Sequence, residues 1–241
     1  MLEIKGRVTT AICYAKVIED EAIEQIRRMC DYDLTRGSKV RIMPDVHAGK
    51  GCTIGTTMTI TDKICPNIVG VDIGCGMYTV KLQDQAIDFE KIDEACHYIP
   101  SGMNVWEGRM ERFDLTQLKC YRSLKDAKRL ERSLGTLGGG NHFIEIQKDT
   151  ETSDVWVMIH SGSRNIGLKV ANHYNKIAQY WNEKWYSEMV SGLAYLPMET
   201  QMAKDYFREM NYCVAFAFAN RQLMMTRICE AIQAVKPETV L

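Results

Sequence analysis

The stretch VGVDIGCGMYTVKL, residues 69–82, joins a glycine-rich loop to the short strand-like run Tyr78–Leu82. Two runs of similar texture precede it, at 40–42 and 53–60. Glycine, proline and aspartate interrupt these runs, which is the pattern of strands joined by tight loops. Residues 39–82 are therefore predicted to form sheet and loops that carry polar side chains.

Helical patterns lie on both sides of this region. After the acidic start at 19–21, apolar residues recur on one face through Cys30, which predicts a helix. Further helices are predicted at about 109–134, 167–185 and 199–234, and strands at 143–146 and 155–159. The expected fold class is α+β: a mixed β-sheet core with site loops at strand ends, flanked by helices, in a single catalytic domain over residues 1–241.

The composition is that of a globular protein without a strong global charge. The chain has 241 residues, is 46% hydrophobic and carries a formal net charge of -1, so any contact with nucleic acid must come from a local basic surface. Nine scattered cysteines without CxxC spacing argue against a disulfide framework or a zinc ribbon. With no signal-peptide pattern and no long apolar run, a cytoplasmic location without a membrane partner is expected.

The loop at 69–77 is the strongest candidate for a metal site. Asp72 and Cys75 are separated by two residues, and glycines on both sides of the cysteine free the loop to point both side chains at one centre. A thiolate and a carboxylate would repel each other there unless a cation lay between them. The commoner alternative for a lone cysteine is a buried small hydrophobe.

Two histidines lie at strand edges beside small, flexible residues, where a ligand is expected. His142 follows the glycine run of LGGGNHFIE at 137–145, and His160 begins HSGSRN at 160–165. In the second motif Ser161, Ser163 and Arg164 offer donors to phosphate oxygens, with Arg164 capable of a bidentate contact. A further loop, PDVHAGKG at 44–51, carries Asp45 and His47, for which a simple polar turn is an equal alternative.

Together the four motifs PDVHAGKG, VGVDIGCGM, GGGNHFIE and HSGSRN resemble the RtcB family of RNA-splicing ligases. The resemblance runs from about residue 37 to the end and matches the N-terminal two-thirds of a complete member. It implies GTP-dependent joining of 2′,3′-cyclic phosphate or 3′-phosphate RNA ends to 5′-hydroxyl ends, in tRNA splicing or RNA repair, with two Mn²⁺ ions. It also implies RNA as a partner, together with a possible activating protein.

The resemblance implies a role for each matching residue. Cys75 would bridge both ions, Asp72 and His142 would complete the first site, and His160 would bind the second. The guanylate would be held by Asn141, His142, Phe143, Ile144 and Glu145, and Arg164 with the two serines would contact RNA phosphate. His47 and Asp45 would orient Asp72 or a substrate. The donor chemistry alone does not choose manganese, because cysteine with histidine is equally a zinc set.

The family pattern is incomplete in this sequence. Its third metal histidine and its guanylylated histidine belong to a C-terminal segment, and no histidine follows His173 here. The guanylylated histidine is therefore expected beyond Leu241, in a chain truncated at its C-terminus that contains no catalytic residue for the guanylylation step. The alternatives are a non-ligating relative that binds metal, nucleotide and RNA, half of a split enzyme, or a zinc hydrolase.

A basic stripe and an isolated histidine complete the candidates. On the predicted helix at 118–134, Arg122, Lys125, Arg129 and Arg132 share one face, which could follow an RNA backbone. An ordinary solvated face is the favoured alternative because Asp126 and Glu131 dilute the charge. His97 ends a helix-like stretch and is interpreted as a surface or capping histidine.

Overall fold

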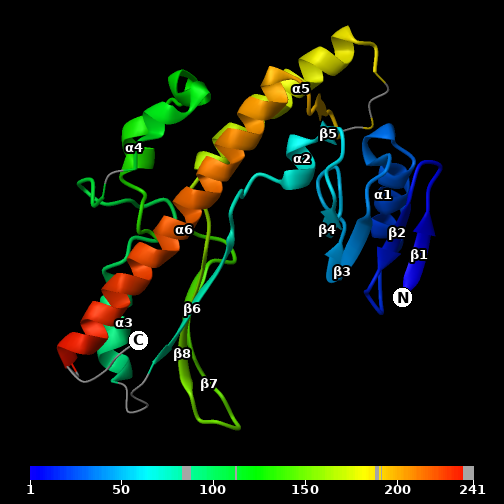
Figure 1. Cartoon of the computed structure of the whole chain (residues 1–241). Helices are drawn as coiled ribbons and strands as arrows, with labels where there is room; N and C mark the ends of the chain where they lie inside the picture. The colour runs from blue at the N-terminus through cyan, green and yellow to red at the C-terminus, as the bar shows by residue number, and fades with distance from the viewer. Residues whose placement is uncertain (83–87, 112, 188–189, 191, 236–241) are drawn as a thin grey trace. The chain divides into compact units, whose positions relative to one another are not determined.

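The computed structural model describes residues 1–82, 88–111, 113–187, 190 and 192–235 (Figure 1). The chain divides into two compact units, one formed by 1–71 with 170–208 and the other by 72–169 with the described residues from 209 onward. Each unit combines helices with its own sheet, so the predicted α+β class is confirmed. The expectation of one catalytic domain over the whole chain stays a prediction.

The main sheet of the first unit has four strands, in the spatial order β1 (Leu2–Lys5), β2 (Thr10–Cys13), β3 (Val40–His47) and β4 (Ile54–Met58). Only the β2–β3 pair is parallel. The helix α1 (Asp20–Cys30) lies in the long connection that a parallel pair requires. The sheet is therefore mixed, as expected, although β1 and β2 were not predicted.

Helix α1 confirms the sequence pattern in detail. Asp20 and Glu21 lie in its first turn and Arg27 and Arg28 in its last, which complements the helix dipole at both ends. Its apolar face is buried in the core of the first unit, together with residues of β2 and β3. The other elements here are η1 (Asp33–Thr35), β5 (Lys63–Ile64), α2 (Pro66–Val69), most of α5 (Ile166–Lys184) and β9 (Leu196–Pro197), which pairs with β5.

The second unit contains a three-stranded antiparallel sheet in the order β6 (Gly76–Leu82), β8 (Val155–Ser161) and β7 (Phe143–Lys148). Along β8 every second residue is buried, so Val155, Val157 and Ile159 face the core. Apolar residues of α3 (Phe89–His97) and of α6 (Gln201–Val235) pack against them. His160, which follows Ile159, therefore lies on the opposite face of the strand.

The prediction of a continuous helix over 109–134 is wrong. The structure has three short elements in its place, η2 (Leu115–Gln117), η3 (Lys119–Ser123) and α4 (Ala127–Glu131). Tertiary contacts replace helical ones: the Lys119 amide donates to Glu209 Oε1 at 2.6 Å, and the Phe113 ring packs edge-on against Phe216. Because the segment changes direction between elements, the basic residues do not form the single helical stripe that their spacing suggested.

The remaining helix predictions are confirmed. The expected helices at 167–185 and 199–234 correspond to α5 and α6, with ends that differ by one or two residues. Leu241, beyond which the guanylylated histidine is expected, lies outside the described residues. That expectation therefore stays a prediction. Within the described part of the chain, no helix is both long enough and apolar enough to cross a membrane.

Candidate metal centre

The candidate ligands gather at one end of the three-stranded sheet. Cys75 directly precedes β6, His142 directly precedes β7, and His160 is the last residue but one of β8. Because β6 and β7 both run antiparallel to β8, the starts of the outer strands lie beside the end of the middle one. In the register, His160 stands opposite Met77 on one side and Phe143 on the other.

The donor atoms of the four side chains converge. Cys75 Sγ lies 3.1 Å from His160 Nε2 and 3.6 Å from His142 Nε2, so the thiol contacts both histidines. His142 Nε2 is also 3.3 Å from Asp72 Oδ2. Donor atoms of Asp72, Cys75 and His142 all lie within 4.8 Å of one another. The structure thus brings together the four residues singled out as ligands in the sequence.

The backbone fixes how both imidazoles are oriented. His142 Nδ1 lies 2.9 Å from the carbonyl of Leu137, and His160 Nδ1 lies 3.0 Å from the carbonyl of Asn141. A carbonyl oxygen only accepts, so each Nδ1 carries the proton and donates it. A metal bound at the centre would then meet the Nε2 lone pair of each neutral ring, which is the arrangement that histidine ligands of metals usually show.

The charges at this centre suit a divalent cation. The adjoining His142 ring lowers the pKa of Asp72, so the carboxylate is ionised near neutral pH. Burial and the neighbouring Asp72 raise the pKa of the Cys75 thiol to about 12, because a thiolate there would lie beside a second negative charge. A carboxylate, a thiol and two imidazole lone pairs are a donor set that a bound cation would stabilise in its deprotonated form.

Glycine is required where the loops approach the ligands. A Cβ atom on Gly162 would overlap Asp72 Oδ1, and one on Gly138 would lie 2.7 Å from His142 Nδ1. Gly138 also has a φ of 91°, which disfavours any other residue. These two glycines let the 138–142 and 160–165 loops pack directly against the candidate ligands.

Comparison with known proteins identifies the family. The family model described as tRNA-splicing ligase RtcB matches residues 33–122 and 107–240. The chain belongs to the RtcB family. It is 35% identical over 228 residues to the RNA-splicing ligase RtcB of Escherichia coli K12, and this alignment covers 83% of the chain and 55% of that protein.

Archaeal relatives match more of the chain at lower identity. The tRNA-splicing ligases RtcB of Thermococcus kodakarensis and Methanococcus maripaludis are each 28% identical to it, and the alignments cover 97% of the chain and 60% of each relative. The RtcB-family chain therefore spans little more than half the length of the curated relatives it matches.

Two residues of α6 that were not predicted from the sequence hold the loops of the candidate centre. Asn220 accepts from the amides of Gly135 and Thr136 and donates to Ser161 Oγ. Arg221 donates from Nη1 to the carbonyls of Gly74 and Ser161, both at 2.7 Å. Both side chains are buried. The available signal was the run of three polar residues Asn220–Gln222 inside an otherwise apolar helix stretch, at FAFANRQLMM.

The residues expected to contact RNA phosphate divide into two kinds. Ser161 and Ser163 are buried, with the Ser161 hydroxyl donating to the carbonyl of Leu137 and the Ser163 hydroxyl accepting from the amide of Gly167. Arg164 donates to Thr136 Oγ1 and to the carbonyl of Gly102, and its left-handed φ of 51° places it beside Gly138. The two serines thus hold the loop, whereas Arg164 keeps further N–H groups next to the centre.

The expected guanylate residues lie at the start of an edge strand. Asn141 precedes β7 and supplies the carbonyl that orients His160, and the Phe143 ring packs against the His160 ring with centroids 5.4 Å apart. Ile144 packs against the core of the second unit, so only its backbone is available to a nucleotide. Glu145 shares the face of Phe143, because side chains alternate along a strand.

The remaining candidates belong to other elements. Asp45 and His47 belong to β3 of the first unit, where His47 Nδ1 lies 2.9 Å from the carbonyl of Asp45. Their role in orienting Asp72 or a substrate stays a prediction. His97 ends α3, where its Nδ1 contacts the carbonyl of Asp93 at 2.8 Å, in accord with a surface histidine at a helix terminus.

Proposed function

We propose that this chain carries the metal-binding part of the active site of an RNA ligase. The reaction would use GTP and manganese to join 2′,3′-cyclic phosphate or 3′-phosphate RNA ends to 5′-hydroxyl ends. The observation that carries the proposal is the cluster of Asp72, Cys75 and His142, joined by His160 through Cys75, at the end of a sheet in a chain of the RtcB family. RNA is the proposed partner and the cytoplasm the proposed location.

Each residue has a place in this proposal. Cys75 contacts both histidines and would bridge two Mn²⁺ ions, with Asp72 and His142 on the first and His160 on the second. Bound metal would neutralise the charge that builds up on phosphoryl oxygens. The Leu137 and Asn141 carbonyls hold the imidazoles in the required tautomer.

The substrates would lie against neighbouring residues. The backbone from Asn141 to Glu145, with the exposed side of Phe143 and Glu145, would hold the guanylate. Arg164 would contact the RNA phosphate through N–H groups that Thr136 and Gly102 leave unused, since a guanidinium offers five. The buried serines would act by fixing the Arg164 loop.

A metal-binding titration tests the centre itself. Cys75→Ala should abolish binding of both manganese ions, because the substitution removes the one donor that contacts both histidines. His97→Ala is the matched control, since this exposed histidine lies outside the centre and should leave the metal content unchanged. Calorimetry and elemental analysis, with zinc in a parallel series, measure the stoichiometry. Equal loss in both variants would overturn the ligand assignment.

A second candidate function is that of a protein that binds metal, nucleotide and RNA without ligating, or of half of a split enzyme whose partner polypeptide supplies the nucleotide-accepting histidine. The observation that favours it is that the chain spans little more than half the length of the relatives it matches. Incubation with GTP and Mn²⁺, followed by intact mass measurement, separates the candidates. A covalent guanylate on the chain alone supports a self-sufficient ligase, and an adduct that requires an added segment downstream of Leu241 supports the split enzyme.

A further inference from the structure

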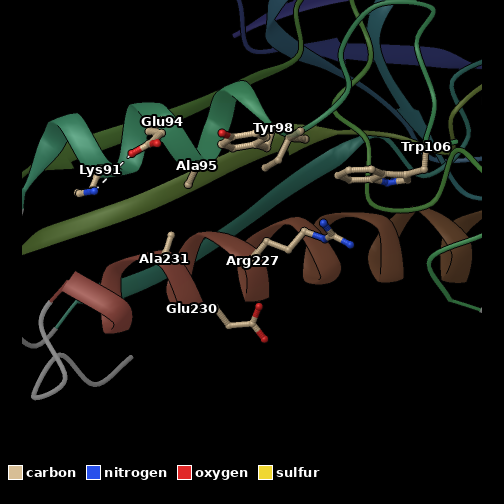
Figure 2. A pocket seen from close by; sticks show the side chains of 9 residues that line it. Lys91, Glu94, Ala95, Tyr98, Trp106, Arg227, Glu230 and Ala231 are labelled. Carbon is tan, nitrogen blue, oxygen red and sulfur yellow. Dashed lines mark ion pairs between the residues drawn. The ribbon is translucent and has the colours of Figure 1, made fainter. Parts of the chain in front are cut away.

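Two cavities lie beside the loop at 106–109 in the second unit. The first, about 600 Å³, lies between α3 and α6, with Trp106 and Arg227 at one end (Figure 2). Its charges balance, because Lys91 pairs with Glu94 at 3.5 Å and Glu230 also lines it. The Arg227 guanidinium lies 4.2 Å from the centre of the Trp106 ring. With its cations engaged and two carboxylates present, this cavity does not favour a polyanion.

The second cavity, about 540 Å³, has the opposite character. It is lined by Arg109, Lys128 and Arg132 against the single carboxylate of Glu131, with Tyr121 completing the wall. Glu131 pairs with Arg109 at 2.5 Å, which leaves the charges of Lys128 and Arg132 uncompensated by a residue of the lining. Lys128 is exposed, and Arg132 Nε is buried without a hydrogen-bond partner. This cavity therefore has the electrostatic character of an anion site.

A path of positive charge connects the cavity to the metal centre. Arg164 adjoins Gly138 and donates to the carbonyl of Gly102, at the start of the loop that continues to Arg109. Arg129, next to Lys128 on α4, donates to the carbonyl of Met103 in the same loop. Burial is the largest cause that lowers the pKa of Arg164, and the positive charge of Arg129 is the next. The two guanidinium groups are therefore electrostatic neighbours. A polyanion whose end lies at the metal centre would follow this path outward.

We propose that the cavity formed by Arg109, Tyr121, Lys128 and Arg132 binds a backbone phosphate of the RNA strand whose end lies at the metal centre. The inference rests on the proposed function and extends it to a second contact with the same strand. The sequence pattern pointed to another set, the stripe of Arg122, Lys125, Arg129 and Arg132. The fold instead separates Arg122 and Lys125 from the cavity and brings in Arg109 from a different segment.

Charge reversal at one residue tests the proposal against a matched control. Lys128→Glu changes an exposed lysine that lines the cavity, and Lys125→Glu changes an exposed lysine three positions earlier that does not. Binding of a fluorescent single-stranded RNA of about 12 nucleotides ending in a 3′-phosphate, a length within the usual range for such sites, is measured by anisotropy with Mn²⁺ present. Circular dichroism checks that both variants fold.

The expected results differ between the two variants. Lys128→Glu should raise the Kd about fivefold, the scale of one solvent-exposed charge interaction. The slope of log affinity against log salt should fall by about 0.7, the change expected when a single strand gives up one phosphate interaction with the protein. Lys125→Glu should change the Kd by less than about twofold, because this lysine does not line the cavity.

Failure of this inference is distinguishable from failure of the proposed function. If the wild-type chain binds manganese through Cys75 and binds the RNA, but Lys128→Glu and Lys125→Glu weaken RNA binding equally or not at all, the cavity assignment is wrong and the ligase proposal stands. If the wild-type chain does not bind the RNA, both are overturned.

Discussion

The two ends of the three-stranded sheet use polar side chains in opposite ways. At the end away from the metal centre, Lys81 of β6 pairs with Asp154 at 2.6 Å, and the Asp149 carboxylate accepts from the amides of Glu151 and Thr152. Each of these charged groups therefore has a partner within the protein, and the Asp149 hydrogen bonds stabilise the turn between β7 and β8.

At the other end, a carboxylate, a thiol and two imidazoles contact one another. Asp72, Cys75 and the Nε2 atoms of His142 and His160 converge, while the buried cation Arg221 donates to backbone carbonyls. The comparison shows how one sheet provides both a structural end and a candidate binding end. At the structural end oppositely charged side chains pair, whereas at the candidate metal centre the contacts join groups that are also metal donors.

Among the substitutions that test this difference between the two ends, Arg221→Met should have the largest effect on stability and on manganese affinity. The change removes the donor to the Gly74 and Ser161 carbonyls, and a buried acceptor left without a partner costs about 1–3 kcal/mol of unfolding free energy. Manganese affinity should fall as well, because Gly74 adjoins Cys75. Urea unfolding and metal titration measure the two losses. Arg208→Met, an exposed position of the same helix, should change stability by less than about 0.5 kcal/mol.

Gly162→Ala should act on the metal end alone. The added Cβ would overlap Asp72 Oδ1 and displace that carboxylate, so manganese affinity should fall about 10–100-fold, the usual cost of disturbing a group that orients a ligand. Gly108→Ala is the control, because nothing lies within 4 Å of its added Cβ. Unchanged affinity in Gly162→Ala would show that Asp72 is not a ligand.

The smallest effect is expected at the paired end, from Asp154→Asn. The hydrogen bond from Lys81 lowers the pKa of Asp154 below its ordinary 3.8, so the ionised group stabilises the fold above that pH and loses this contribution as the pH falls through the acid range. The variant should therefore melt slightly lower than wild type at pH 7, with the difference vanishing in acid. Its manganese affinity should equal that of wild type, and any loss would contradict the separation of the two ends.

Local patterns were a good guide wherever local forces dominate. The periodicity of α1 and the strand runs before Leu82 and around His142 and His160 are short-range features, and they appear in the structure nearly as expected. The segment 109–134 failed because its apolar residues are held by partners distant in sequence, such as Glu209 for the Lys119 amide. Asn220 and Arg221 were passed over for the same reason, since their partners lie at least 58 residues away.

The sequence by itself determined the family and the α+β class and singled out the four residues that the structure brings together, because glycine-flanked polar motifs preserve the chemistry of a site in linear form. Only the tertiary structure decided that Cys75 contacts both histidines, that backbone carbonyls set their tautomers, and that Arg109 rather than Arg122 lines the basic cavity. These properties depend on strand register and on loop packing against α6, where residues up to 147 positions apart meet. The physical reason is that hydrogen bonds and electrostatic fields depend on distance in space, which the order of residues along the chain does not contain.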